Sequence, residues 1–437
     1  MGDSINVLLY TTIGELIKKY REQASLTISH LGILTGLSKG VISKIELGET
    51  KRPELKTIKA IATVLAIPYQ EIVGYYIEVE QRVEALHELL LEVIEFANIP
   101  LVSKVALKLL QSPQGETMAT LDRLFQLTEP IKRLDIKLLL YSIIIKYARE
   151  HGIPRYIAKG LLQKYLLERQ DLKRLEETFK SGEELLHYVD FLSTKERITF
   201  YFRLGLHAHN TKKYVQCIHL CETGLKEDKS SNELKARAYL AMINSYLIMG
   251  NVEAVENHLP IYESFQYGFV AESSKLTRAI VKARKREYQA AIPMLKQCFQ
   301  EISAHSRIHV ANELLQVYFQ MEEMDSIARL LDQESEILSL DATTPYKHSS
   351  LGDYYRYKGA YLIKTGKFAE GEASYLQSML AYGEIRAYEE ITECMNEILS
   401  HYAARGKVIE LHSVQKLSEV YNKICKNKVK IGGEVRL

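Results

Sequence analysis

The sequence predicts an all-α fold in two parts, a short N-terminal domain of compact helices and a long array of repeated helix pairs. Three observations predict this class. Apolar residues recur at three- and four-residue spacing almost from end to end, which is the period of an amphipathic helix. Few segments show the sustained alternation of a strand. Glycine and proline are sparse, at 23 and 9 of 437 residues, so little interrupts the helices.

The composition is that of a globular chain with a large core and little net charge. Apolar residues make up 46%, charged residues 26%, and the formal net charge is +2. This balance excludes a polycation that coats nucleic acid, so any DNA contact must come from a local patch. Five scattered cysteines favour a reducing compartment. No signal peptide or membrane-spanning run is recognisable, so we expect a cytoplasmic protein without membrane association.

Residues 13–67 have the pattern of four short helices with clear start and stop signals. Thr27 can cap the second helix and Gly36 can end it, while Ser38 can cap the third and Gly48 can end it. A short helix, a tight turn at Gly36 and a second short helix make a helix-turn-helix. The residues expected to face its core are Ile13, Leu16, Ile17, Tyr20, Ile28, Leu31, Leu34, Val41, Ile42, Ile45, Leu55, Ile58, Ile61, Ala62 and Leu65.

The third of these helices has a length that suits the major groove of DNA. Its outward residues are small or basic, and lysine and serine bind both base edges and phosphates. Residues 1–70 also carry nine basic and six acidic side chains, so the local charge is positive. The residues predicted to contact DNA are Thr27, Ser38, Lys39, Gly40, Ser43, Lys44, Lys51 and Arg52.

The segment LTISHLGILTGLSKGVISKIELGE, followed by RPELKTIKAIATVLAI, resembles the Xre or phage-repressor type of helix-turn-helix. The family usually has a glutamine early in its second helix, where this chain has Ile28. Gly40 weakens the third helix by about 1 kcal/mol and offers no side chain to a base. The resemblance implies that the domain binds double-stranded operator DNA.

One residue spacing recurs six times after residue 200. It has a small or apolar residue at position 0, often an aromatic at +3, a glycine or polar residue at +7, an aromatic or apolar residue at +9 and a large one at +16. The copies start at Gly205, Ile243, Ala279, Leu315, Gly359 and Leu399, with a weaker copy at Gln163. This spacing resembles the tetratricopeptide repeat, whose ideal period is about 34 residues. Stacked units of this kind form a right-handed superhelix with a concave side.

In tetratricopeptide arrays the first helix of each pair lines the concave side. An asparagine amide has a donor and an acceptor, so it can hold the backbone of an extended peptide. Arg237 and Arg356 can bind a carboxylate through paired hydrogen bonds, and apolar residues can form side-chain pockets. The residues predicted to contact a peptide are Phe202, His209, Asn210, Arg237, Leu240, Asn244, Leu276, His309, Asn312, Gln316, Asp353, Arg356 and Asn396.

Together the two parts resemble the peptide-responsive regulators of the Rap–Rgg–NprR–PlcR–PrgX superfamily, with the phage arbitrium receptors. The resemblance implies a homodimer that binds operator DNA and is switched by a short signalling oligopeptide. The domains expected are a DNA-binding domain in 1–67, a connecting helix in 68–98, a peptide-binding and dimerisation repeat domain in 99–422 and a basic tail in 423–437. Two alternatives stay open: a repeat domain that mainly binds a protein such as a response regulator, and an Xre repressor with scaffolding repeats.

No other group of residues in the sequence predicts a metal-binding or catalytic site. Cys217 and Cys221 lie four residues apart near three histidines, but they occupy the +12 and +16 core positions of their repeat, so we expect packing and no metal. The sequence contains no glycine-rich phosphate loop, HExxH or GxSxG motif. We therefore expect neither a cofactor nor an enzyme.

Overall fold

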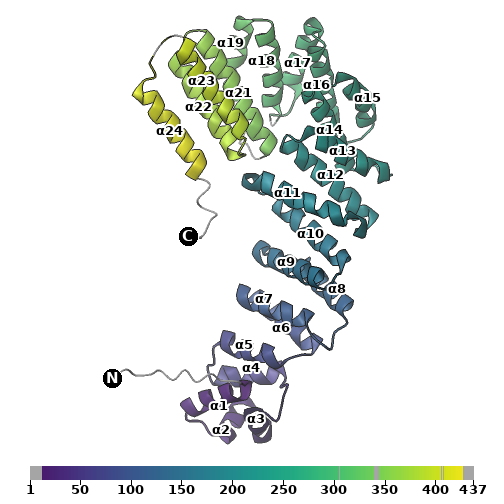
Figure 1. Ribbon diagram of the computed structural model, residues 1–437, viewed down its shortest axis with the longest axis vertical. Coiled ribbons are helices and arrows are strands. Elements are labelled where there is room, and N and C mark those ends of the chain that lie inside the picture. The colour runs from purple at the N-terminus through teal and green to yellow at the C-terminus, as the bar shows by residue number, and fades with distance from the viewer. Residues whose placement is uncertain (1–11, 305, 339–343, 405, 407, 427–437) are drawn as a thin grey trace. The chain divides into compact units, whose positions relative to one another are not determined.

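The computed structural model describes residues 12–304, 306–338, 344–404, 406 and 408–426. Within these residues the fold is all-α, as predicted (Figure 1). The chain divides into two compact units, with the boundary between residues 167 and 168. Each unit is described by itself. None of the helices in the described ranges is long and apolar enough to cross a membrane.

Unit 1 begins with the predicted helix-turn-helix. Its helices are α1 (Ile13–Gln23), α2 (Ile28–Thr35), α3 (Lys39–Glu46) and α4 (Leu55–Val64). The turn signals act as predicted, since Gly36 and Gly48 adopt left-handed backbone angles of φ 71° and 73° after α2 and α3. Most of the expected core is buried, including Leu16, Ile17 and Ile42, each at 0% exposure.

The connection after the helix-turn-helix differs from the sequence prediction. Two helices, α5 (Tyr69–Val79) and α6 (Val83–Glu95), replace the single connecting helix predicted in 68–98. The chain breaks at Glu80–Arg82, where the buried Glu80 carboxylate takes the hydrogen bonds that helical neighbours would otherwise make. Helix α5 packs against α1, α4 and α7 (Ile99–Leu110), so it does not act as a free linker. We call α1 to α5, residues 13–79, the head. Unit 1 continues through α7, α8 (Thr117–Thr128), α9 (Leu134–Glu150) and α10 (Pro154–Glu168).

Unit 2 is a stack of antiparallel helix pairs. It opens with α11 (Leu175–Leu185), which two short 3₁₀ turns flank. The pairs are α12 (Thr194–Asn210) with α13 (Tyr214–Glu227), α14 (Glu233–Ile248) with α15 (Val252–Glu263), α16 (Gly268–Arg284) with α17 (Tyr288–Glu301), α18 (Arg307–Gln320) with α19 (Met324–Leu331), and α21 (Pro345–Lys364) with α22 (Phe368–Glu384). A short α20 (Glu334–Ile337) follows α19.

The predicted repeat spacing matches the helix boundaries of these five pairs. The +9 residue is the first residue of each second helix, at Tyr214, Val252, Tyr288, Met324 and Phe368. The +7 residue is the left-handed turn residue in every pair, whether glycine or not, at Lys212, Gly250, Arg286, Glu322 and Gly366. The residue at position 0 is small where the side chain at +16 packs directly against it. In the fifth pair, for example, a Cβ on Gly359 would lie 2.8 Å from the ring of Tyr375.

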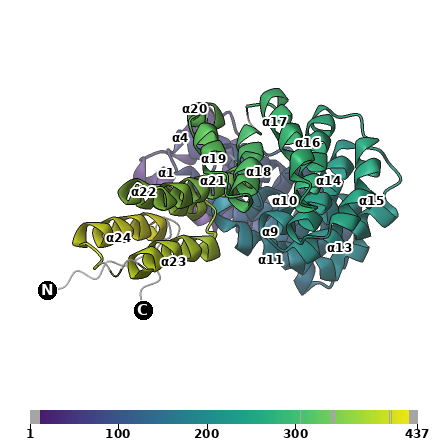
Figure 2. The same ribbon diagram turned by 90° about the horizontal axis from the view of Figure 1, so that it is seen from above.

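The last predicted repeat matches the structure only in part. Its +7 residue, Gly406, has the left-handed backbone of the other pairs, with φ 60°, but its second helix begins at Leu411 and not at Val408. The final helices are α23 (Tyr388–Ala404) and α24 (Leu411–Lys426), and α24 packs on α22 (Figure 2). Leu411, at the +12 core position, is 72% exposed, and Leu399, at position 0, is 40% exposed. The first residues of the predicted basic tail, 423–426, complete α24, and residues 427–437 lie outside the described ranges.

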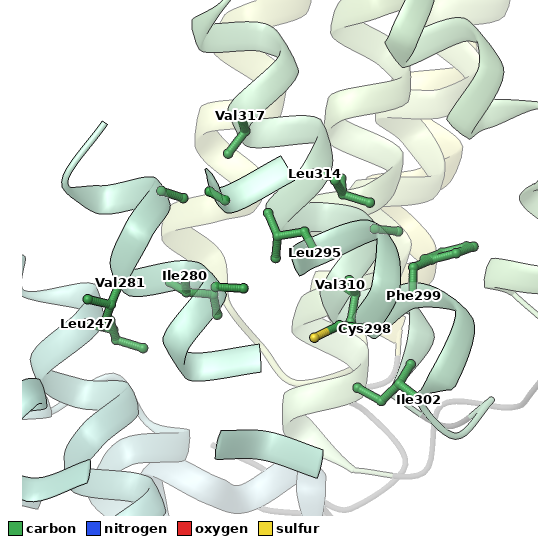
Figure 3. Packing of buried hydrophobic residues seen from close by; sticks show 14 of the residues in the cluster. Leu247, Ile280, Val281, Leu295, Cys298, Phe299, Ile302, Val310, Leu314 and Val317 are labelled. Atoms are coloured by element: carbon green, nitrogen blue, oxygen red, sulfur yellow. The ribbon is translucent and has the colours of Figure 1, made fainter. Parts of the chain in front are cut away.

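The core of unit 2 runs continuously from α14 to α21. One cluster of buried residues extends from Ala236 in α14 to Tyr354 in α21. Figure 3 shows part of it, where Leu295 and Phe299 of α17 lie near Val310 and Leu314 of α18. A smaller cluster joins α22, α23 and α24. Each pair therefore buries its apolar face against its neighbours, as a repeat array requires.

Candidate nucleic-acid and ligand-binding sites

The edge of α3 that was predicted to read DNA is open to solvent. Lys39, Gly40 and Lys44 are exposed along this helix, and Ser43 is half-buried beside them. A Cβ on Gly40 would meet nothing within 4 Å, so no packing contact requires glycine there. Because no side chain projects from Gly40, the backbone of α3 can approach the base edges closely at this position.

Two side chains that were predicted to touch DNA also build the helix-turn-helix. The Thr27 Oγ1 accepts a hydrogen bond from the His30 N–H at 3.1 Å and caps α2. The Ser38 Oγ accepts one from the Val41 N–H at 3.3 Å and caps α3. Both residues are exposed, so the caps place two helix N-termini, with their partial positive charge, at the surface.

Helix α3 is held rigidly against α1. The Arg21 guanidinium donates to both carboxylate oxygens of Glu46, at 2.7 and 2.8 Å, and to the Leu26 carbonyl at 2.9 Å. The Arg21 and Glu46 side chains are only 11% and 5% exposed. Alongside them, a Cβ on Gly14 would overlap the Ile45 carbonyl oxygen, so only glycine permits this approach of the two helices. The position of α3, which we call the reading helix because it is predicted to contact base edges, is therefore set by close contact as well as by charge.

Two core predictions in the helix-turn-helix were wrong. Leu34 is 52% exposed and Val41 is 40% exposed. Each belongs to an eight-residue helix, and helices this short bury only a narrow stripe, formed in α3 by Ile42 and Ile45. Val41 is accordingly an apolar side chain at the surface of α3, and such a side chain can contact a thymine methyl group.

The loop after α3 is tied to the break between α5 and α6. Lys51 is exposed, whereas the Arg52 guanidinium donates a hydrogen bond to the Gln81 side chain. Next to Gln81, Arg82 donates to the Pro53 carbonyl at 3.3 Å and to the buried Glu80 carboxylate. Glu80 and Gln81 were not among the predicted residues, and only the interrupted helical pattern at 80–82 could have indicated them.

In unit 2 a polar cluster forms where first helices of different pairs meet. We define it as His209, Ser245, His309, Asn312, Tyr346 and Ser350. The His209 Nδ1 lies 2.9 Å from the Ser245 Oγ, whose own hydrogen goes to the Ala241 carbonyl. The serine oxygen must therefore accept, so we assign the proton to the Nδ1 of His209 and leave its Nε2 as an acceptor. Burial lowers the pKa of His209 to about 4, which keeps it neutral.

Tyr346 joins helices that are far apart in the sequence. Its ring centroid lies 4.2 Å from that of His309 on α18 and 6.5 Å from that of His209 on α12. Asn312 donates its amide hydrogen to the Ser350 carbonyl at 2.8 Å. Its buried Oδ1 accepts no hydrogen bond from any residue that the structure describes. The cluster thus offers two hydrogen-bond acceptors, the amide oxygen of Asn312 and the Nε2 of His209.

Charged groups border the polar cluster. Lys212, in the turn between α12 and α13, forms an ion pair with Glu390 on α23. Burial lowers the pKa of Lys212, although Asp353 and other carboxylates oppose that change. Burial also raises the pKa of Asp353, which accepts a hydrogen bond from the Tyr382 hydroxyl at 2.6 Å. These contacts connect the first pair of unit 2 with its last helices.

The structure separates the predicted peptide-contacting residues into groups. Nine of them are half-buried on the first helices of the pairs: His209 and Asn210 at the end of α12, Leu240 and Asn244 on α14, Leu276 on α16, His309, Asn312 and Gln316 on α18, and Asp353 on α21. Arg237 is exposed but already paired with Glu233 at 2.7 Å, and Asn396 is exposed on α23. Of the predicted set, only His209, His309 and Asn312 belong to the polar cluster.

Two predicted peptide contacts do not fit the structure. Phe202 is fully buried, and its ring fills the space above Gly224 of α13, where a Cβ would lie 2.7 Å from the Phe202 Cε1. It therefore packs inside its own helix pair and offers no pocket. Arg356 donates to Glu393 at 2.5 Å and to Glu397 at 2.9 Å, so its guanidinium is already engaged. The glycine at 224 was the sequence signal that Phe202 packs against α13 and does not face a ligand.

Comparisons with known proteins identify the N-terminal part. Residues 17–72 match the helix-turn-helix family model HTH_3, so the predicted Xre-type domain is confirmed. Over 61 residues the chain is 36% identical to the uncharacterized HTH-type transcriptional regulator RghRB of Bacillus subtilis (strain 168), covering 14% of this chain and 44% of that protein. Over 89 residues it is 34% identical to the HTH-type transcriptional repressor RghR of the same strain, covering 20% and 66%. The chain thus spans less than half of the first relative's length and just under two thirds of the second's.

Three solved structures are similar to this chain at low sequence identity. One is PlcR of Bacillus thuringiensis, in complex with the peptide PapR7 and DNA, with a TM-score of 0.28 and 15% identity over 87% of this chain and 98% of that chain. Another is phAimR, with a TM-score of 0.35 and 13% identity over 94% and 100%. A third is the tetratricopeptide-repeat sensor protein PH0952 of Pyrococcus horikoshii, at 0.46 and 13% over 96% and 66%.

Proposed function

We propose that this chain is a transcriptional regulator that binds operator DNA as a homodimer and is switched by a short oligopeptide held in unit 2. DNA binding rests on the helix-turn-helix match and on the exposed edge of α3 with Lys39 and Lys44. Counterion release from such lysines gives sequence-independent affinity, and the base edges facing α3 supply specificity.

The observation that carries the peptide proposal is the polar cluster. The Asn312 Oδ1 is buried without a hydrogen-bond partner among the described residues, and an unsatisfied buried acceptor costs about 1–3 kcal/mol. The His209 Nε2 is a second acceptor, on the first helix of another pair, α12. Two acceptors of this kind match the repeated N–H groups of an extended peptide backbone, and they do not require a particular side chain.

The decisive experiment measures DNA affinity with and without peptide. Overlapping synthetic peptides from the reading frame next to the gene are titrated into the full chain by calorimetry, and the DNA affinity and oligomeric state are then measured. We expect one peptide to bind and to change at least one of these two properties. No change with any peptide would contradict gating, and partners captured equally without residues 1–67 would favour the protein-interaction alternative.

A matched pair of variants tests the site itself. Asn312→Ala removes the unsatisfied acceptor and should weaken peptide binding about tenfold. Asn257→Ala changes an exposed asparagine on α15, the second helix of its pair, and should leave peptide binding unchanged. Equal effects of the two substitutions would contradict the placement of the peptide on the first helices.

A further inference from the structure

Unit 2 contains a cationic cavity that neither the DNA-binding edge nor the polar cluster uses. It has a volume of ≈ 490 Å³ and lies between α17, α18, α19 and α20. Its apolar floor is formed by Phe299, Leu314, Tyr318 and Leu330, all at most 7% exposed. A volume of this size falls in the range of sites for small organic ligands.

The rim of this cavity has an excess of positive charge. Lys296, Arg307 and Arg329 line it, against one lining carboxylate, Glu336. The nearest approach of Glu336 to Arg307 is 3.8 Å, beyond hydrogen-bond distance. Arg329 donates to the Ser326 hydroxyl at 2.9 Å, and no ion pair involves Arg329 or Lys296 within the described ranges. The cations at this rim are therefore incompletely neutralised.

Arg307 is the most unusual of the three cations. Its Nε is fully buried and donates to no acceptor in the part of the chain that the structure describes. Other arginines of unit 2 hold a carboxylate closely: Arg197 lies 2.7 Å from Glu227, Arg278 2.7 Å from Glu263 and Arg284 2.9 Å from Glu313. A buried guanidinium N–H without a partner is costly, and an anion in the cavity would satisfy it.

We propose that this cavity binds a small organic anion, a carboxylate or a phosphate ester, that carries an apolar ring or short chain. The anionic oxygens lie against Arg307 and Arg329, and the apolar body rests on Phe299, Leu314 and Tyr318. The charge excess selects the acid, because Arg binds carboxylate and phosphate oxygens through paired N–H groups. The floor selects the apolar body, because its contact removes apolar area from water.

The test titrates the full chain with four probes by calorimetry: phenyl phosphate, 3-phenylpropionate, inorganic phosphate and the neutral 3-phenylpropionamide. We expect saturable one-site binding of at least one aromatic acid, weaker binding of inorganic phosphate and none of the amide. The better of the two acids then distinguishes a phosphate ester from a carboxylate ligand. Absence of saturable binding by both acids overturns the proposal, as does inorganic phosphate binding as tightly as phenyl phosphate.

Variants locate the binding. Arg307→Gln should weaken the aromatic acid about tenfold or more, since a hydrogen bond to a charged group contributes about 1.5–3 kcal/mol. Arg278→Gln removes an arginine of the adjacent α16 that already holds Glu263, and it should leave binding unchanged. Lys296→Gln changes an exposed rim residue without disturbing the core and should also weaken binding. Unchanged affinity in both Arg307→Gln and Lys296→Gln would place the acid elsewhere and refute the assignment.

Discussion

Arg21 of α1 and Glu46 of α3 form a two-pronged ion pair that is almost completely shielded from water, with oxygen–nitrogen distances of 2.7 and 2.8 Å. The hydrogen bond to Glu46 and its charge raise the pKa of Arg21, although burial opposes this. This pair connects the first helix of the head to its reading helix. It is therefore the place where the stability of the fold and the geometry of DNA binding depend on the same two side chains.

Glu46→Gln should destabilise the head by about 3–5 kcal/mol, because it leaves Arg21 charged and buried without its partner. Calorimetric melting of the full chain would show the loss as a lower transition temperature for the head. Glu22→Gln is the control, because Glu22 is exposed and lies 3.8 Å from the same guanidinium. A Glu46→Gln melt that matches this control would show that the pair contributes little.

Lys44→Ala should weaken DNA binding and reduce the slope of log affinity against log salt by about 1, as loss of one phosphate contact does. The measurement uses a duplex that the wild-type chain selects from random sequence, at several salt concentrations. Lys275→Ala, at an exposed position on α16, should change neither quantity. An unchanged slope for Lys44→Ala would mean that another surface faces the DNA.

Acid should destabilise unit 1 through Glu80. Burial alone would raise the pKa of this carboxyl, but hydrogen bonds from Arg82, Tyr76 and Gln81 outweigh it and lower the pKa to about 2. Its stabilisation is therefore complete above the ordinary value of 4.5 and is lost as the pH falls towards 2. Melting temperatures between pH 6 and pH 3 should fall less steeply in Glu80→Gln, from a lower starting point, than in the exposed control Glu84→Gln.

Acid should destabilise unit 2 at higher pH than unit 1. Burial lowers the pKa of both His209 and His309 to about 4, against an ordinary value of 6.5. Between these values the unfolded chain binds more protons than the folded one, so stability falls as the pH drops from 6.5. The double variant His209→Gln/His309→Gln should show a flatter dependence in calorimetry, and His412→Gln, at an exposed site on α24, should not.

The turns between paired helices offer a test of backbone strain. Arg286 has φ 62° where Gly250 of the neighbouring pair has φ 75°. Left-handed backbone costs a residue with a Cβ about 1 kcal/mol, so Arg286→Gly should raise the melting temperature of unit 2 and Gly250→Ala should lower it. If both substitutions lowered it, the side chain of Arg286 would contribute more than its strain removes.

The sequence was sufficient for local structure because its signals are local. The caps at Thr27 and Ser38, the stop at Gly36 and the first residues of five second helices all follow from patterns within a few residues. In contrast, the polar cluster joins His209 of the first helix pair to Tyr346 of the fifth, and only the tertiary fold brings them together. The error at Phe202 has a similar origin, since its burial depends on a glycine in the next helix.

The contact at Gly14 has a consequence for how such a protein can be regulated. The Ile45 carbonyl oxygen occupies the space that a larger side chain at Gly14 would need, so α1 and α3 are in close backbone contact. If unit 2 responds to a peptide as proposed, we expect the response to move the head as one body to or from an operator, with the position of α3 against α1 unchanged. The time at which the protein binds DNA would then be adjustable, while the DNA sequence that the head recognises stays the same.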